Sequence, residues 1–209
     1  KKMKKGLFIT FEGGEGSGKS LQARTLYRHL ETLAIPVMLI HEPGSTALGE
    51  KLSRLLKWGH SNEISPLSEL MLFNASRVQL VQKVIQPALS KGKIVLCDRF
   101  ADSTSAYQGY GRGLELGFIE RINLTATGGL KPDVTFLLDI PIKDGLARKS
   151  TRETNRFERE EIVFHERVRK GYRKLAQAEP RRFTVIDARL EKKIIAGIIW
   201  QRVAEILKT

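Results

Sequence analysis

Short runs of apolar and β-branched residues recur along the chain, and longer segments of helical length separate them. The runs cover residues 7–11, 37–40, 94–96, 134–138 and 183–186. Because each run is apolar almost without interruption, we expect strands covered on both faces, as in a parallel sheet. Helices are predicted over residues 19–33, 48–57, 66–90, 115–127, 142–149, 159–178 and 190–207. The alternation predicts an α/β fold, with helices on both faces of a five-stranded parallel sheet.

The longest predicted helix, over residues 66–90, has a proline near each end. Pro66 suits the first helical position, where a missing N–H group costs no hydrogen bond. Pro87 is expected to kink the helix or to end it early, because it removes a hydrogen bond and its ring meets the preceding turn. Lys91 and Gly92 follow as a stop signal.

Length and composition limit the kinds of protein that fit. A chain of 209 residues suits one well-buried core, so we expect a single domain over residues 1–209, with residues 1–5 as a tag or a disordered tail. The apolar runs are far shorter than the roughly 20 residues of a membrane span, so no membrane contact is expected. The single cysteine, Cys97, lies in an apolar run and is expected to be a core thiol. With no disulfide to form, the expected location is the cytoplasm.

The chain is basic, with 36 Lys+Arg against 23 Asp+Glu and a formal net charge of +13. This excess suits a nucleic-acid binder, and it equally suits an enzyme whose substrates are polyanions. The basic residues are dispersed, and aromatic residues do not alternate with them as they do in single-strand binding. The distribution therefore favours small nucleotides over DNA or RNA as partners.

The most specific motif covers residues 13–20, which read Gly-Gly-Glu-Gly-Ser-Gly-Lys-Ser and fit G-x-x-x-x-G-K-[ST]. It lies between a predicted strand and a predicted helix, the context in which this motif forms a phosphate loop. Backbone N–H groups of such a loop point at phosphate oxygens, and the helix adds its positive N-terminal end. Lys19 is expected on the β- and γ-phosphates and the Ser20 hydroxyl on Mg²⁺. The predicted ATP-binding residues of the loop are Gly13, Gly14, Glu15, Gly16, Ser17, Gly18, Lys19 and Ser20.

A second pair of charges follows the third apolar run. Asp98 and Arg99 leave the carboxyl end of a predicted strand, where ligands bind in parallel α/β sheets. The carboxylate of Asp98 suits Mg²⁺ through water, and the guanidinium of Arg99 suits a phosphate. We therefore expect a second anion-binding point beside the phosphate loop.

Four further blocks of the sequence each resemble a short sequence motif. Residues 98–108, Asp-Arg-Phe-Ala-Asp-Ser-Thr-Ser-Ala-Tyr-Gln, resemble D-R-[YFHW]-x-x-S-x-x-A-Y-Q. Residues 41–46, His-Glu-Pro-Gly-Ser-Thr, resemble R-E-P-G-G-T, and residues 73–77, Phe-Asn-Ala-Ser-Arg, resemble F-x-A-x-R. Residues 155–158, Asn-Arg-Phe-Glu, resemble D-R-[IF]-E. These four motifs are those of bacterial-type thymidylate kinases, which the sequence therefore resembles. The blocks occur in the family's order, and the resemblance extends from residue 8 to residue 187.

This resemblance implies a three-layer P-loop NTPase fold with a mobile lid. It implies a homodimer formed through residues 66–90. The implied reaction is ATP + dTMP ⇌ ADP + dTDP with Mg²⁺, which serves dTTP synthesis. It implies that Lys19, Arg99, Arg152 and Glu15 are catalytic and that Ser20, Asp98 and Glu15 contact the metal. Arg148 and Asp187 are assigned to ATP. The implied dTMP site consists of Glu42, Pro43, Phe73, Arg77, Arg99, Ser103, Thr104, Tyr107 and Gln108.

The lid is expected over residues 148–159, a stretch with little apolar material that contains Arg148, Lys149, Arg152 and Arg156. Arginines of such a segment can close over the transferring phosphate. Gly16 stands where the eukaryotic-type enzymes have an arginine, so resemblance to the bacterial type implies that the lid supplies this charge. Arg152 is the first choice, with Arg148 and Arg156 as the alternatives.

Four positions depart from the family pattern, namely His41, Ser45, Ser53 and Asn155. Ser53 stands where a phosphate-facing arginine is common. Arg54 is the alternative source of that charge, although adjacent residues of a helix point about 100° apart.

On the residues alone, other interpretations stay open. Without the resemblance, Phe73 and Arg77 are a core aromatic and a surface charge one helical turn apart. A kinase acting on another nucleoside monophosphate fits the same fold, and the net charge also fits a phosphate-loop ATPase acting on nucleic acid. A non-catalytic binding module is disfavoured, because Lys19, Ser20 and Asp98 are all present.

Overall fold

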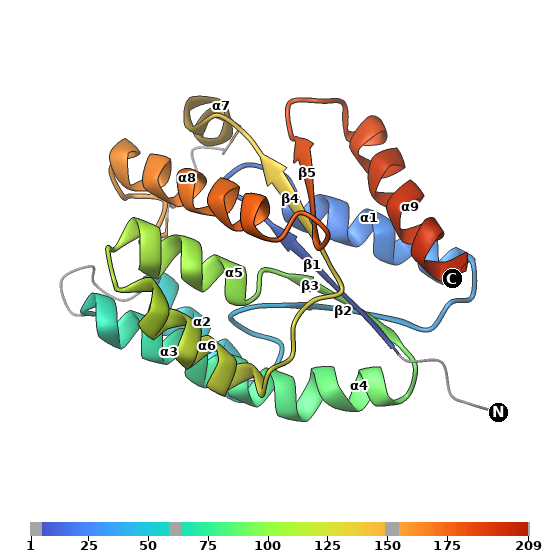
Figure 1. The fold of residues 1–209 in the computed structure, drawn as a ribbon, viewed down its shortest axis with the longest axis horizontal. Coiled ribbons are helices and arrows are strands. Elements are labelled where there is room, and N and C mark those ends of the chain that lie inside the picture. The colour runs from blue at the N-terminus through green and yellow to red at the C-terminus, as the bar shows by residue number, and fades with distance from the viewer. Residues whose placement is uncertain (1–5, 59–63, 149–154, 209) are drawn as a thin grey trace.

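The computed structural model describes residues 6–58, 64–148 and 155–208. Five strands pair in parallel in the order β2-β3-β1-β4-β5, which confirms the predicted sheet (Figure 1). The strands are β1 (Leu7–Glu12), β2 (Val37–His41), β3 (Ile94–Asp98), β4 (Val134–Asp139) and β5 (Phe183–Asp187). Strand β1, which leads into the phosphate loop, lies at the centre of the sheet.

Each strand continues one or two residues beyond its predicted end and finishes on a polar residue. These final residues are Glu12, His41, Asp98, Asp139 and Asp187. They belong to the ladder: His41 is in register with Asp98, and Asp139 with Asp187. Because all five strands run the same way, these polar side chains collect at one edge of the sheet, where a ligand is expected to bind.

Helices cover both faces, which confirms the three-layer arrangement. Helices α1 (Lys19–Thr32) and α9 (Lys192–Lys208) lie together on one face, where Ile9 and Leu96 pack against them. The other face carries α4 (Gln86–Ser90) and α8 (Ile162–Ala178), and here the alternate strand residues Phe8 and Val95 are buried. The remaining α-helices include α2 (Ala47–Trp58), α3 (Pro66–Leu80), α6 (Leu116–Thr127) and α7 (Ile142–Ala147). No helix in the described ranges has the length and apolarity to cross a membrane.

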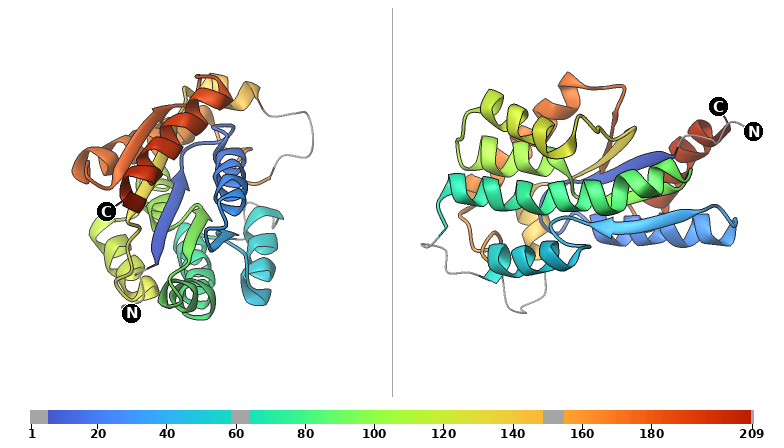
Figure 2. Two further views of the ribbon diagram at one scale, coloured as in Figure 1. Left: turned by 90° about the vertical axis from the view of Figure 1, so that its right-hand side faces the viewer. Right: turned by 90° about the horizontal axis from the view of Figure 1, so that it is seen from below.

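The long helix predicted over residues 66–90 keeps its course through Pro87, so an early end at this proline is wrong (Figure 2). Helix α3 passes into a π-helical stretch, η1 (Val81–Ile85), before α4 begins. Pro87 occupies the first turn of α4. In the π-helical stretch just before the proline, each carbonyl accepts from the residue five positions later instead of four. The helix therefore continues although Pro87 has no N–H group to donate.

Residues 101–111 are helical, although their serine, threonine and glycine content did not indicate a helix. A short helix, α5 (Ala101–Thr104), continues into the π-helical η2 (Ser105–Gly111). Tertiary contacts override local preference here, since Thr104, Tyr107 and Gln108 are all buried. Cys97, just before this segment, is fully buried, which confirms a core thiol.

Candidate active site

The phosphate loop joins β1 to α1 and turns through glycines with positive φ. The angles are 140° at Gly13, 67° at Gly16 and 88° at Gly18. A Cβ atom at Gly16 would overlap the carbonyl oxygen of Gly145 in α7. Only glycine fits both the conformation and the space, so this loop has no room for an arginine at residue 16. Residue 16 therefore cannot supply a second cation, and Lys19 is the only basic residue of this loop.

Lys19 lies at the first position of α1 with its ammonium group turned back over the loop. Nζ donates to the Gly14 carbonyl oxygen at 2.7 Å and to Ser17 Oγ at 3.3 Å. Burial, followed by the positive charge of Arg99, lowers the pKa of Lys19 to about 8. An anionic phosphate beside Lys19 would stabilise its charged form.

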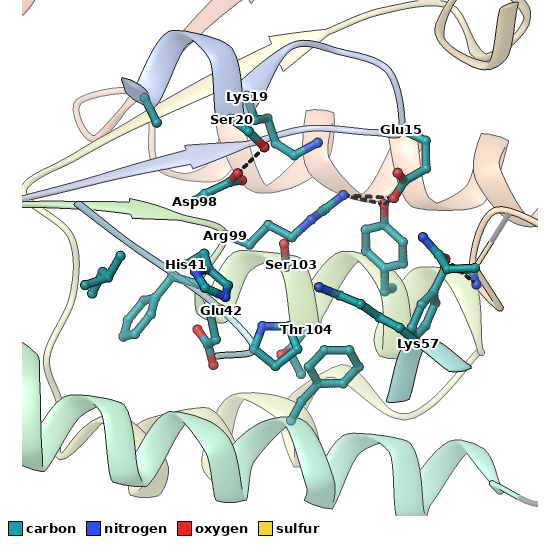
Figure 3. Close-up of a pocket in the computed structure, with 18 of the residues that line it drawn as sticks. Glu15, Lys19, Ser20, His41, Glu42, Lys57, Asp98, Arg99, Ser103 and Thr104 are labelled. Atoms are coloured by element: carbon teal, nitrogen blue, oxygen red, sulfur yellow. Dashed lines mark hydrogen bonds and ion pairs between the residues drawn. The ribbon is translucent and has the colours of Figure 1, made fainter. Parts of the chain in front are cut away.

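Ser20 and Asp98 bring two oxygen ligands together. Ser20, in the first turn of α1, donates a hydrogen bond to a carboxylate oxygen of Asp98 at the end of β3 (Figure 3). Mg²⁺ takes oxygen ligands and is commonly held by one or two protein groups together with substrate phosphates. This hydroxyl and this carboxylate fit such an ion.

Arg99 is the centre of a second polar cluster. Its guanidinium forms an ion pair with Glu15 Oε1 at 2.9 Å, and it also donates to Ser103 Oγ at 3.2 Å and to the Tyr107 hydroxyl at 3.1 Å. The Tyr107 hydroxyl in turn donates to Glu15 Oε1 at 3.0 Å. The backbone of Arg99 has φ of 72°, which directs the chain from β3 into this cluster. Four predicted site residues from three segments thus meet at one point.

Arg77 is almost completely buried, so the interpretation as a surface charge is wrong. Its Nε lies 2.7 Å from Glu42 Oε1, and its terminal nitrogens donate to Asn123 Oδ1 at 2.7 Å and to Thr104 Oγ1 at 2.8 Å. Burial raises the pKa of Glu42 to about 7 although Arg77 opposes this shift. The guanidinium is therefore held in a fixed orientation by partners from three separate parts of the chain.

One cavity of about 860 Å³ joins these groups. Figure 3 shows Lys19, Ser20 and Asp98 at one side of it and Glu42 and Thr104 at another, with Arg99 between them. Pro43, Phe73, Arg77, Tyr107 and Gln108 also line it. The Phe73 ring lies 5.9 Å from that of Phe157, and both rings form part of the cavity wall. The cavity is large enough for a nucleotide, and it has an anion-binding group on each side.

Arg148 and Asp187, the two further residues assigned to ATP, differ in their relation to the cavity. Arg148 lines the cavity and donates to the Ala188 carbonyl oxygen at 2.7 Å. Asp187, one residue earlier, forms an ion pair with Arg189 at 2.7 Å and is not part of the cavity wall. The link between Arg148 and Ala188 nevertheless brings the two predicted segments together.

Of the arginines predicted for the lid, the structure describes Arg156 but not Arg152. Arg152 and residues 149–154 lie outside the described residues, so the role of Arg152 stays a prediction. Arg156 is buried, and its guanidinium lies 2.5 Å from Glu69 Oε2 on α3. It also donates to the Leu56 carbonyl oxygen at 3.1 Å. Arg156 is therefore committed to a structural ion pair and is not available to close over a phosphate.

Some groups of the site have no counterpart in the sequence motifs. Glu12, the last residue of β1, accepts hydrogen bonds from the Phe100 N–H at 2.7 Å, Ser103 Oγ at 2.6 Å and the Tyr172 hydroxyl at 2.8 Å. Burial, then the charge of Asp102, raises the pKa of Glu12 to about 7. A carboxylate directly before a phosphate loop is a usable signal for Glu12. Tyr172 has none, since it comes from a helix 160 positions later.

A phosphate loop, a Mg²⁺-compatible oxygen pair and a second anion site facing one cavity define a P-loop kinase that acts on a small phosphorylated acceptor. Comparison with known proteins narrows this class. The sequence model of thymidylate kinase matches residues 11–198. The chain belongs to the thymidylate kinase family.

Curated relatives and a solved structure agree with this assignment. The chain is 54% identical to a thymidylate kinase of Dehalococcoides mccartyi over 202 residues, 97% of this chain and 98% of the relative. It is 47% identical to one of Roseiflexus castenholzii, over 91% of this chain and 89% of the relative. The crystal structure of thymidylate kinase from Ehrlichia chaffeensis superposes with a TM-score of 0.77 at 34% identity, covering 95% of this chain and 98% of the other.

Proposed function

We propose that this chain transfers the γ-phosphoryl group of ATP to the phosphate of dTMP, giving ADP and dTDP, at the cavity between Lys19 and Arg99. The observation that carries the proposal is that one cavity joins the phosphate loop to the Arg99 cluster and to the pocket around Arg77. Phosphoryl transfer needs two anions held in line and the developing charge neutralised, and little covalent chemistry from the protein.

On the donor side, backbone N–H groups of the loop and Lys19 bind the β- and γ-phosphates. Lys19 is already buried beside the loop, so its charge is positioned before the phosphates arrive. Ser20 and Asp98 would hold Mg²⁺, and Glu15 would contact its bound waters. When bound there, Mg²⁺ would neutralise part of the phosphate charge.

On the acceptor side, Arg99 binds the phosphate of dTMP. Its ion pair with Glu15 and its contacts to Ser103 and Tyr107 hold the guanidinium in place before the substrate arrives, so little ordering is needed on binding. A phosphate monoester is already ionised near neutral pH, and it therefore attacks without a strong general base.

The thymine ring is placed in the pocket around Arg77. Phe73 offers a face for stacking, the donors of Arg77 suit the O4 carbonyl, and Thr104 meets the N3 edge. Tyr107 crowds the 2′ position of the sugar and favours deoxyribose, while Gln108 and the Glu42-Pro43 turn complete the wall. Two further proposals concern ATP: Arg148 and Asp187 lie on the adenine side, and Arg152 closes over the transferring phosphate from a lid over residues 148–159.

We also infer that the chain is a single domain and that two copies form a homodimer. We infer that it acts in the cytoplasm, on nucleotides and not on nucleic acid. Large apolar side chains are exposed on α2 and α3, namely Leu55, Trp58, Leu67 and Met71. A contact between copies of the chain would remove them from water.

An acceptor panel tests the proposed function. Release of ADP from ATP and Mg²⁺ is measured with dTMP, dUMP, dCMP, dGMP and UMP in separate reactions, with one reaction lacking acceptor and one containing DNA. We expect the highest kcat/KM with dTMP and little release in the two controls. Preference for another monophosphate would remove the thymine-pocket assignment, and release with DNA alone would contradict the kinase function.

Arg77→Ala is expected to raise the KM for dTMP about 10- to 100-fold, because a hydrogen bond from a charged donor contributes about 1.5–3 kcal/mol. The KM for ATP serves as the internal control and should stay within about twofold. Loss of Arg77 removes the group that lowers the pKa of Glu42, so Glu42 can become protonated and the fold survives. An unchanged KM for dTMP would exclude Arg77 from the base pocket.

A further inference from the structure

Lys57 is a cation of the cavity that no motif assigns. It is the penultimate residue of α2, and its side chain lines the same cavity as Arg99 and Asp98. In Figure 3 Lys57 extends into the cavity on the side of Arg99 that faces away from Lys19 and Ser20. Residues four apart share one face of a helix, so Lys57 lies one turn beyond Ser53 on the buried side of α2.

The helix orientation decides which basic residue of α2 can reach a ligand. Ser53 is buried, whereas Arg54 is exposed and does not line the cavity. Arg54 therefore cannot supply the positive charge that Ser53 lacks. Lys57 is partly buried, and its longer side chain enters the cavity from the same helical face.

The position of Lys57 is fixed from outside the helix. Its carbonyl oxygen accepts a hydrogen bond from the Arg156 N–H at 3.0 Å, and the Leu56 carbonyl oxygen accepts one from Arg156 Nε at 3.1 Å. Arg156 is itself anchored by its ion pair with Glu69. These bonds hold the last turn of α2 beside the cavity, so the ammonium group is presented from a rigid base.

The charge of Lys57 is not neutralised by a direct partner. Among the described residues, no carboxylate oxygen lies within 4.0 Å of its ammonium nitrogen. Burial lowers the pKa of Lys57, and the positive charge of Arg99 lowers it further, whereas Glu50, Asp98 and Glu15 act in the opposite direction. Two cations facing one cavity, with no carboxylate bound directly to Lys57, form a site that an anion would stabilise.

Arg77 is the other arginine at the acceptor end of the cavity. The donors of Arg77 are directed to Glu42, Asn74, Asn123 and Thr104. These partners hold Arg77 in the part of the cavity assigned to the base. Arg99 and Lys57, which also line the cavity, are two candidate cations for the acceptor phosphate.

We propose that Lys57 binds the phosphate of dTMP together with Arg99, and so supplies from the next turn of α2 the charge that is missing at Ser53. This inference rests on the proposed function, since it concerns the same acceptor. Two cations on the acceptor phosphate offset the repulsion between it and the incoming γ-phosphate of ATP.

The test compares Lys57→Gln with Lys57→Arg and with Arg54→Gln, a control on the exposed side of α2. Dissociation constants for dTMP and for thymidine, which lacks the phosphate, are measured by calorimetry for each protein. We expect Lys57→Gln to weaken dTMP binding about tenfold or more and to leave thymidine binding within twofold. Lys57→Arg should restore most of the dTMP affinity, and Arg54→Gln should match the parent.

Two results would overturn the inference. Unchanged dTMP affinity in Lys57→Gln would show that Lys57 does not contact the phosphate. Equal losses for dTMP and thymidine would show a structural effect on the pocket instead of a charge contact. Failure of the parent protein to bind dTMP would overturn the proposed function as well, which separates the two claims.

Discussion

Replacement of Lys19 with alanine is expected to lower kcat about 10³-fold or more while leaving the fold intact. The charge of Lys19 acts on the phosphoryl group in a site with little water, where one preorganised donor contributes about 10²- to 10³-fold and a cation on the transferring group more. Within the described ranges, the hydrogen bonds of this side chain go to the loop itself, at the Gly14 carbonyl and Ser17, so its removal disturbs no distant contact there. Steady-state kinetics at saturating ATP and dTMP measure the effect.

Lys51→Ala is the matched control, since Lys51 is an exposed lysine on α2 that does not line the cavity. It should retain the parent rate. A Lys19→Ala protein that turns over within about tenfold of the parent would contradict the assignment of Lys19 to the transferring phosphate.

Glu69→Gln is expected to lower the free energy of unfolding by about 3–5 kcal/mol, the usual cost of leaving one charge of a buried ion pair without its partner. Glu69 is completely buried and accepts bonds from Arg156 at 2.5 Å, from Arg112 at 3.2 Å and from Gln108 at 2.6 Å. A neutral amide at this position leaves the buried Arg156 guanidinium without a counter-charge. Urea denaturation of parent and variant gives the difference.

Glu205→Gln provides the comparison, because Glu205 pairs with Arg202 at 3.6 Å on the exposed side of α9. Such surface pairs contribute about 1 kcal/mol or less. If Glu69→Gln and Glu205→Gln lower the free energy of unfolding by the same small amount, the ion pair of Glu69 does not stabilise the contacts of α3 with η2 and with Arg156.

The sequence predicted the sheet well because strand cores are local patterns. Residues 7–11 or 134–138 are apolar whatever surrounds them, and a parallel sheet requires such runs. The polar last residue of each strand was missed, since Glu12 or Asp98 looks like a loop residue until the ladder partner is known. Helix 101–111 was missed for the same reason: its stability comes from burial of Thr104, Tyr107 and Gln108.

The candidate site could likewise be predicted only where the signal is local in the sequence. Motifs indicated Lys19, Ser20, Asp98 and Arg99, because chemistry and spacing are both visible in the sequence. Pairings over long separations carried no signal: Arg156 is 87 positions from Glu69, and Tyr172 is 160 positions from Glu12. Arg77 illustrates the limit, since only its partners reveal that a charged residue at helical spacing is buried.

Transfer of label from γ-³²P-ATP tests the central claim most directly. The protein is incubated with labelled ATP, Mg²⁺ and dTMP, and the products are separated, with Lys19→Ala in parallel. We expect the label in dTDP, in amounts equal to the ADP formed, and almost none with Lys19→Ala. Label found in inorganic phosphate, with unlabelled dTMP recovered, would contradict transfer between two nucleotides bound in this cavity.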